Sequence, residues 1–343
     1  MTSIQFEHVT KTYPGGAAPA VDDVSFTVRE GAICMLLGTS GSGKTTLLRM
    51  VNRLIDPTSG QILVNGVPTT DQDPIALRRG MGYVIQQVGL FPHMTVAQNV
   101  ATVLTILGER KRESTPRVDE LLRLVGLDPT EYAHRYPRQL SGGQQQRVGL
   151  ARALAADPSV LLMDEPFGAL DAITRARVQD ELLQVQRGVR KTILFVTHDV
   201  NEAFKLGDQI VVMSDGRLQQ QGTPVELLAN PANDFVRQLV GADDALRQLE
   251  YLPVTAALEP LSGGTAPASG ERVPAAAPLL DALLRLIAGG EPALAVERDG
   301  ETIGQVTLGS LSALVLAHRT TPAPNASDTS DAGAGAGAAA VAG

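Results

Sequence analysis

The stretch from residue 33 to residue 49, ICMLLGTSGSGKTTLLR, most constrains how this chain can fold. An apolar run leads into a glycine-rich loop, and the residues after the loop have helical spacing, so we predict a strand, a turn and a helix. Gly38, Gly43, Lys44 and Thr45 fit the pattern G-x-x-x-x-G-K-[ST]. A phosphate-binding loop needs glycines because consecutive backbone N–H groups must wrap around phosphate oxygens. The alternative is a Gly/Ser-rich turn with a solvated lysine.

Within this loop, Lys44 is expected to neutralise terminal phosphates and Thr45 to hold Mg²⁺. The N-terminus of the helix that starts near Gly43 adds its dipole. The predicted cofactor-binding residues are therefore continuous along the loop: Gly38, Thr39, Ser40, Gly41, Ser42, Gly43, Lys44, Thr45 and Thr46.

Length and composition set the broad class. The 343 residues leave room for about two domains, and 43% hydrophobic with 19% charged residues is ordinary for globular proteins. Cys34 is the sole cysteine, so an intrachain disulfide or cysteine metal site is excluded. No long uncharged apolar run or secretory signal pattern is present, so we expect a cytosolic chain, or one bound to a membrane through another protein. The net charge of −8 argues against a nucleic-acid partner, although a local basic face can exist within an acidic total.

The segments around the loop predict further strands and helices. Alternating apolar residues near positions 4–9 and 24–28 indicate two paired strands, and Asn65-Gly66 indicates a hairpin. Tyr13 follows the first strand, where its ring could stack on a base or simply pack. From about 90 to 150 the pattern becomes helical, and Thr115 with Pro116 resembles a helix N-cap and first turn.

Residues 140–158, LSGGQQQRVGLARALAADP, place Ser141 and two glycines before a helix, whose N–H groups would face an anion. The tetrapeptide LSGG alone is weak evidence for an anion-binding helix start, since it recurs at 261–264. Pro267 forbids a helix after that second copy, so we interpret it as linker.

Two carboxylates end the strand SVLLMDEP, and a histidine ends a later apolar strand, TILFVTHD. Open α/β sheets bind ligands at the carboxyl ends of their strands. We therefore expect Asp164 to hold Mg²⁺ and Glu165 to polarise an attacking water, with His198 at the same edge. The alternatives are a solvated acidic turn and a structural histidine.

The order of phosphate loop, helical insertion, LSGGQ and DEP resembles the ATP-binding subunit of an ABC transporter over the first 240 or so residues. The resemblance implies a P-loop α/β domain with an antiparallel β subdomain and a helical insertion, and it implies ATP and Mg²⁺ as cofactors. It also assigns individual roles. Tyr13 would stack on adenine, Gln86 would sense Mg²⁺ and the γ-phosphate, Asp164 would support the metal, Glu165 would be the general base, Asp171 would lie at the dimer contact, and His198 would contact the γ-phosphate.

In this family each ATP lies between the phosphate loop of one copy and the signature segment of the other, which here is Ser141, Gly142, Gly143 and Gln144. The resemblance therefore implies a homodimer on the cytoplasmic face of the membrane. Separate permease subunits would dock near residues 86–100, and a solute-binding protein would complete the system. VIQQVGLFPHMTVAQNV most resembles importers of glycine betaine, choline, carnitine and related quaternary amines.

After the ATP-binding domain (1–240), we predict a linker and the start of a regulatory region (241–272), then helix, strand, Asp299-Gly300 turn, strand and helix at 273–319. This last segment resembles one CBS motif, a small α/β module appended to betaine-type importers. Residues 320–343 are Ala/Gly-rich, and their composition predicts disorder.

Two rival functions remain. A soluble ABC ATPase acting on nucleic acid or ribosomes usually carries two cassettes or a long coiled-coil insertion, and neither pattern is seen here. A nucleotide-responsive regulator without turnover conflicts with the presence of Glu165 and His198. The transport ATPase is therefore the leading hypothesis.

Overall fold

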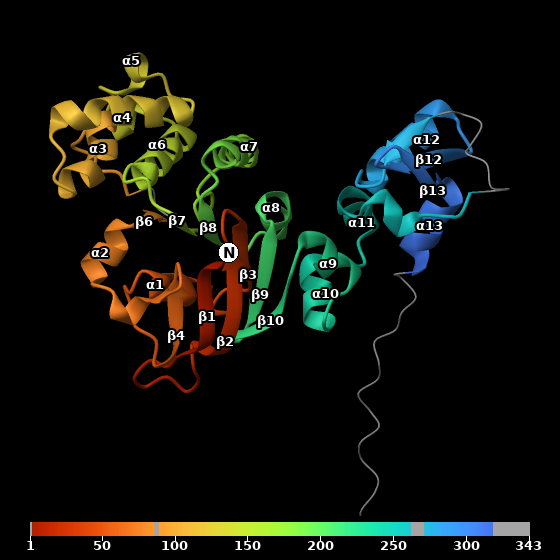
Figure 1. Ribbon diagram of the computed structural model, residues 1–343, viewed down its shortest axis with the longest axis horizontal. Coiled ribbons are helices and arrows are strands. Elements are labelled where there is room, and N and C mark those ends of the chain that lie inside the picture. The colour runs from red at the N-terminus through yellow and green to blue at the C-terminus, as the bar shows by residue number, and fades with distance from the viewer. Residues whose placement is uncertain (1, 86–88, 262–270, 318–343) are drawn as a thin grey trace, which may run out of the picture. The chain divides into compact units, whose positions relative to one another are not determined.

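The computed structural model describes residues 2–85, 89–261 and 271–317 (Figure 1). The chain divides into two compact units, Met1–Ala242 and Asp243–Gly343. No helix in the described ranges is both long and apolar enough to span a membrane.

A six-stranded sheet forms the centre of the first unit. Its neighbouring strands run parallel except for the antiparallel pair at one edge. Strands β3 (Ile33–Gly38) and β8 (Thr192–Thr197) are buried at every position, which explains their uninterrupted apolar sequences. The carboxyl ends of three inner strands meet at one edge of the sheet. In spatial order the strands are β10 (Arg217–Gly222), β9 (Gln209–Ser214), β3 (Ile33–Gly38), β8 (Thr192–Thr197), β7 (Val160–Asp164) and β6 (Met81–Val84).

Helices follow the parallel strands β3, β7 and β8. The phosphate loop leads from β3 into α1 (Lys44–Val51), and β7 leads through a short turn into α7 (Ala172–Val189). Strand β8 leads into α8 (Val200–Leu206). The first unit also contains α2 (Pro74–Arg79), α9 (Pro224–Ala229) and α10 (Asp234–Val240).

A second, four-stranded sheet has the order β2 (Val21–Arg29), β1 (Thr2–Lys11), β4 (Ser59–Val64) and β5 (Val67–Pro68). The predicted pairing of the first two strands is confirmed, and Asn65-Gly66 turns the chain between β4 and β5 as predicted. Phe6 stacks on Phe26 with ring centroids 4.2 Å apart. Both rings belong to the buried cluster that also contains Leu36 of the central sheet, so the two sheets share one core.

The predicted helical insertion forms α3 (Val96–Ile106), α4 (Lys111–Leu124), α5 (Pro129–Tyr132) and α6 (Gly142–Leu154), which gather at the upper left of Figure 1. The apolar face predicted for α4 is buried, with Val118, Leu121, Leu122 and Val125 at most 2% exposed.

The start of α4 was predicted wrongly. Thr115 and Pro116 do not begin the helix, which starts at Lys111 and contains Pro116 in its interior. The backbone N–H of Arg110 donates to Glu113 Oε2 at 3.2 Å, which satisfies one of the donors that precede a helix. Burial of the apolar face outweighs the one helical hydrogen bond that Pro116 cannot make.

The second unit contains a three-stranded sheet of order β11 (Arg272–Pro274), β12 (Ala293–Arg298) and β13 (Glu301–Thr307). Helices α12 (Leu279–Gly289) and α13 (Leu308–Ala317) flank the β12–β13 hairpin in the predicted order, and Asp299 and Gly300 both have positive φ at its turn. The parallel strand β11 was not predicted. The segment predicted to be a linker and the start of a regulatory region (241–272) contains α11 (Ala245–Tyr251) and a 3₁₀ turn (Val254–Ala257). The second LSGG, from residue 262, and the tail lie outside the described residues.

Candidate nucleotide site

The loop between β3 and α1 depends on glycine at its end. Gly43 has φ of +98°, a conformation that side-chain-bearing residues rarely adopt. A Cβ atom there would lie 2.4 Å from the carbonyl oxygen of Ala20. Only glycine therefore brings the chain this close to its neighbour while leading directly into α1.

Lys44 is the buried cation of the loop, with 5% of its surface exposed. Its Nζ donates to the carbonyl oxygens of Gly38 (2.8 Å) and Thr39 (2.7 Å) and to Ser42 Oγ (3.2 Å). Burial lowers the pKa of Lys44, and the nearby carboxylates of Glu165 and Asp164 act in the opposite direction. The loop thus concentrates one positive charge beside the backbone N–H groups that would face phosphate oxygens.

Asp164 ends β7 beside the first turn of α1. Thr45 Oγ1 donates to Asp164 Oδ1 at 2.9 Å, and an Arg49 guanidinium nitrogen lies 4.0 Å from Asp164 Oδ2. Burial raises the pKa of Asp164, while the Thr45 hydrogen bond lowers it. A hydroxyl and a carboxylate are oxygen ligands of the kind that Mg²⁺ prefers, with the remaining positions left to water and phosphate. The two residues therefore fit a magnesium ion.

Glu165 and His198 lie together although they end different strands. His198 Nδ1 is 3.2 Å from Glu165 Oε1. The backbone N–H of Glu165 donates to the carbonyl of Val196 at 3.0 Å, and Glu165 has a positive φ of 44°. The side chain of His198 is 63% exposed and that of Glu165 is 24% exposed. The ionised Glu165 carboxylate could thus accept a proton from a water at the sheet edge, with the His198 imidazole beside it.

The signature segment forms the start of α6. Ser141 is its N-cap: Oγ accepts from the backbone N–H of Gln144 at 3.3 Å, and Gln144 Oε1 accepts from the N–H of Ser141 at 2.9 Å. A Cβ on Gly143 would lie 2.8 Å from Thr174 of α7, so that glycine permits close helix packing. Ser141 and Gly142 are exposed at this helix end.

The other predicted site residues have separate places. Tyr13 follows β1 with 42% of its surface exposed, and Lys11 Nζ is 5.3 Å from its ring centroid. Asp171 is the N-cap of α7 and accepts from the N–H of Thr174 at 3.0 Å, which lowers its pKa. Gln86 lies outside the described residues. Thr39, Ser40 and Gly41 form the exposed part of the loop, and Thr46 is half-buried in α1.

Sequence reasoning missed Arg49, which approaches Asp164. The spacing could have predicted it, because Arg49 follows Thr45 by four positions and both therefore lie on one face of α1. Thr45 and Arg49 therefore reach the same carboxylate from consecutive turns.

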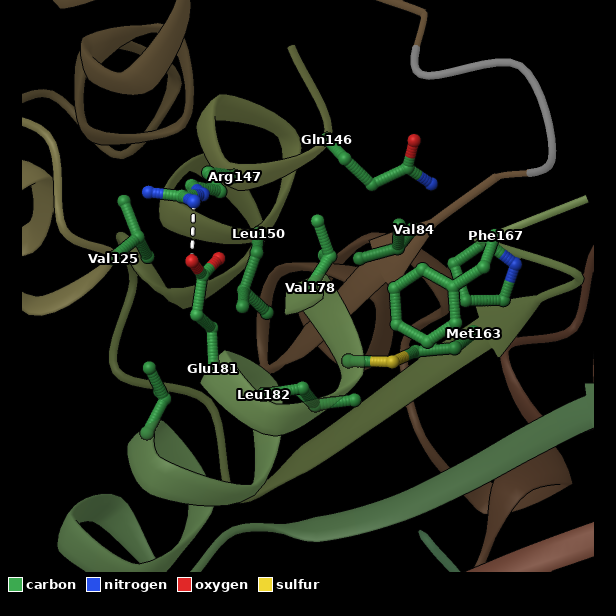
Figure 2. Close-up of a pocket in the computed structure, with 12 residues that line it drawn as sticks. Val84, Val125, Gln146, Arg147, Leu150, Met163, Phe167, Val178, Glu181 and Leu182 are labelled. Carbon is green, nitrogen blue, oxygen red and sulfur yellow. Dashed lines mark hydrogen bonds and ion pairs between the residues drawn. The ribbon is translucent and has the colours of Figure 1, made fainter. Parts of the chain in front are cut away.

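A small cavity lies where α6 and α7 pack over β6 and β7 (Figure 2). Arg147 of α6 pairs with Glu181 of α7 at its border, and the interior is lined by apolar side chains such as Leu150, Val178 and Leu182. Its volume of about 20 Å³ holds at most one water molecule. We therefore assign the cavity to packing between the helices.

Comparison with known proteins agrees with this geometry. Residues 21–168 match the family model described as ABC transporter. The glycine betaine uptake system ATP-binding protein YehX of Escherichia coli is 51% identical over 241 residues, which is 70% of this chain and 77% of that protein. The chain belongs to the ABC transporter family of ATP-binding proteins.

Other relatives of this ABC protein are named for related solutes. The osmoprotectant import ATP-binding protein OsmV of Salmonella typhimurium is 53% identical over 249 residues, covering 72% of this chain and 65% of the relative. The carnitine transport ATP-binding protein OpuCA of Listeria monocytogenes is 51% identical, covering 70% and 60%. The match thus spans less than two thirds of the length of these two relatives.

Solved structures show the same fold. A dimeric post-hydrolysis structure of the ATP-binding cassette MJ0796 bound to ADP and Pi has a TM-score of 0.57 at 35% identity, covering 64% of this chain and 98% of that one. The structure of cbiO1 from Clostridium perfringens has a TM-score of 0.62 at 29% identity, covering 67% and 92%. The predicted α/β cassette is confirmed.

Proposed function

We propose that this chain is the ATP-hydrolysing subunit of an ABC importer for glycine betaine or related quaternary amines. The observation that carries the ATP-hydrolysing role is the approach of His198 to Glu165 at the strand edge that also holds Asp164 and the Thr45 hydroxyl. The solute class is proposed from relatives that are named for glycine betaine uptake and carnitine transport. A base, a histidine and a metal-binding pair beside one phosphate loop are the parts that phosphoryl transfer to water requires.

In this mechanism the phosphate loop and Lys44 bind the triphosphate. Thr45 and Asp164 would hold Mg²⁺, which would neutralise charge on the phosphates. Glu165 accepts a proton from the attacking water, and His198 contacts the γ-phosphate from a position fixed against Glu165. Tyr13 would stack on adenine, and Gln86, which lies outside the described residues, would sense the metal and the γ-phosphate.

The proposal includes a homodimer. Ser141 and its neighbouring glycines present an exposed helix start whose N–H groups suit an anion, and they close over the nucleotide bound by the other copy. Asp171 lies at the contact between the copies. One relative structure is described as dimeric and bound to ADP and Pi, which supports this arrangement. Hydrolysis cleaves the γ-phosphate from the nucleotide, and departure of that phosphate removes the charge that bridges the copies, so the dimer opens.

Permease subunits and a solute-binding protein complete the proposed system, which places this chain on the cytoplasmic face of the membrane. A groove of about 440 Å³ lies between β6, α2 and the end of α3. Exposed Ile75 and Ile106 line it together with Arg78, Arg79 and Arg152. This combination fits a permease segment that presents apolar side chains and a carboxylate.

The C-terminal unit is proposed to be a CBS-like regulatory module. The helix, hairpin and helix of residues 279–317 support this proposal. Deleting residues 250–343 should change the response of reconstituted transport to salt or adenine nucleotides, and an identical response would reject a regulatory role.

Two measurements test the proposed function. The full-length chain should release phosphate from ATP in the presence of Mg²⁺, and Lys44→Ala should abolish that release because the triphosphate loses its buried cation. The chain should also copurify from detergent extracts with hydrophobic permease subunits. Bound RNA or DNA in place of permeases would instead favour the nucleic-acid ATPase.

A further inference from the structure

One arginine outside the predicted site joins the two turns that flank the nucleotide edge. Arg175 lies in the first turns of α7, and its guanidinium donates to Leu170 O at 3.1 Å and to Asp199 Oδ2 at 3.2 Å. Helical side chains lean toward the helix N-terminus, which directs Arg175 back toward the turn that precedes α7. Its two contacts therefore belong to different strand-end turns.

The Asp199 contact fixes the backbone beside His198. Asp199 Oδ1 caps α8 by accepting from the N–H groups of Asn201 (2.9 Å) and Glu202 (3.3 Å), so its second oxygen is the one left for Arg175. The N–H of Asp199 also donates to Thr197 Oγ1 at 3.0 Å. His198 thus stands between two residues whose positions are set by hydrogen bonds.

The Leu170 contact fixes the end of the turn that begins at Glu165. Within that turn the N–H of Gly168 donates to Glu165 O at 3.2 Å, and the N–H of Leu170 donates to Phe167 O at 3.1 Å. The next residue, Asp171, caps α7. The turn is therefore a continuous hydrogen-bonded unit from the proposed base to the proposed dimer contact.

These contacts close a ring. It runs from Glu165 along its turn to Leu170, through Arg175 to Asp199, and back through His198, whose Nδ1 lies 3.2 Å from Glu165 Oε1. The planar guanidinium of Arg175 therefore holds the Leu170 turn and the Asp199 turn at the same time, with one hydrogen bond to each.

We propose that Arg175 is a positioning residue that couples the turn before α7 to His198. This inference rests on the proposed ATPase function. When a second copy contacts the Asp171 region, Arg175 transmits the position of that turn to the histidine, which already lies beside the base in the single chain.

The test compares Arg175→Ala with Lys205→Ala in the full-length chain. Lys205 is a matched control because it also joins α8 to α7, with Nζ 2.7 Å from Asp180 Oδ1 and 3.2 Å from Ala176 O, without touching either turn. Arg175→Ala should lower kcat for ATP by roughly 10- to 100-fold, with KM changed by less than about threefold. Arg175→Lys should restore part of the rate, since one ammonium cannot hold both oxygens in the same geometry.

The outcomes separate this inference from the proposed function. Lys205→Ala should retain the unmodified rate. Equal kcat for Arg175→Ala and the unmodified chain, or equal losses in both alanine variants, would overturn the positioning role and leave the ATPase intact. A rise in KM without a fall in kcat would also overturn it, because Arg175 would then act on binding. Absence of phosphate release from the unmodified chain would instead reject the proposed function itself.

Discussion

At the residue scale, two ionisable side chains of the site are buried, and burial disfavours the charged form of each. Lys44 and Asp164 are both largely buried, and burial lowers the pKa of the first and raises the pKa of the second. Each group is held by short contacts: Lys44 by loop carbonyls and Asp164 by the Thr45 hydroxyl. A bound triphosphate with Mg²⁺ would supply the opposite charge that each of these groups favours.

The phosphate loop offers a test of glycine's role. Gly41 and Gly43 both have positive φ, but a Cβ meets nothing within 4 Å at Gly41 and lies 2.4 Å from Ala20 O at Gly43. Gly41→Ala should therefore cost about 1 kcal/mol of unfolding free energy from backbone strain alone. Gly43→Ala should cost at least about 1 kcal/mol more, because the chain must also move apart. Denaturant unfolding without nucleotide measures both, and equal costs would contradict this account of the loop.

Glu202 gives a pH-dependent prediction. It is 5% exposed, accepts from Gln179 Nε2 at 3.1 Å, and burial raises its pKa. Because the folded chain binds this proton more tightly than the unfolded chain, ionised Glu202 reduces stability above the raised pKa, and the cost disappears as pH falls below the usual value of about 4.3. Glu202→Gln should therefore raise Tm at neutral pH.

The advantage of Glu202→Gln over the unmodified chain should narrow steadily as the pH is lowered. Thermal melts of both chains across the acid range measure it. A variant that is less stable at neutral pH, or a difference that grows with acidity, would show that the ionised carboxylate stabilises the fold.

Much of the residue-level site could be predicted from sequence, because strand ends in an open α/β sheet share an edge. That rule predicted that Asp164, Glu165 and His198 would lie at the same edge as Lys44, where the structure places them. The links made by Arg175 could not be predicted in this way. Its contacts with Leu170 and Asp199 depend on how α7 packs beside α8, and no local pattern encodes that packing.

At the element scale, the ion pair between Arg147 of α6 and Glu181 of α7 joins the helix that begins at the signature segment to the core. The side chains are 14% and 26% exposed and border the small cavity in Figure 2. Removing one partner leaves a poorly solvated charge, which should make each single substitution more costly than loss of a surface pair.

Arg147→Met and Glu181→Leu should each lower the free energy of unfolding by about 2 kcal/mol. The double variant should lose less than either single one, since two apolar side chains can pack into the cavity. Arg135→Ala is the control: its pair with Glu131 is exposed and should contribute less than about 1 kcal/mol. Additive losses in the double variant, measured by chemical denaturation, would contradict the assignment.

Element boundaries show where sequence reasoning is limited. Apolar periodicity predicted the buried face of α4, but Pro116 was taken as a start signal, and the helix instead starts at Lys111. A proline removes one backbone N–H donor from a helix. Whether the helix nevertheless includes the proline depends on the packing of Val118 and its apolar neighbours. Likewise, β11 has only three residues, so it carries no periodic signal and forms by pairing with β12.

At the scale of the whole molecule, the proposed mechanism requires two copies. Each chain carries one phosphate loop, and its own Ser141 stands at the exposed start of α6 in the helical insertion. Bound ATP would therefore stabilise the dimer, and the fraction of dimer would depend on the ATP concentration. Hydrolysis at Glu165 would limit the lifetime of that pair.

The most direct test of this central claim is the solution mass of Glu165→Gln measured by light scattering with saturating ATP and Mg²⁺. The variant should bind ATP without turnover and show twice the protomer mass, because the bridging phosphate is retained. Glu165→Gln combined with Ser141→Arg should keep the protomer mass, since the larger side chain blocks closure over the nucleotide. A single-protomer mass for Glu165→Gln with ATP bound, or doubling in both variants, would contradict the account.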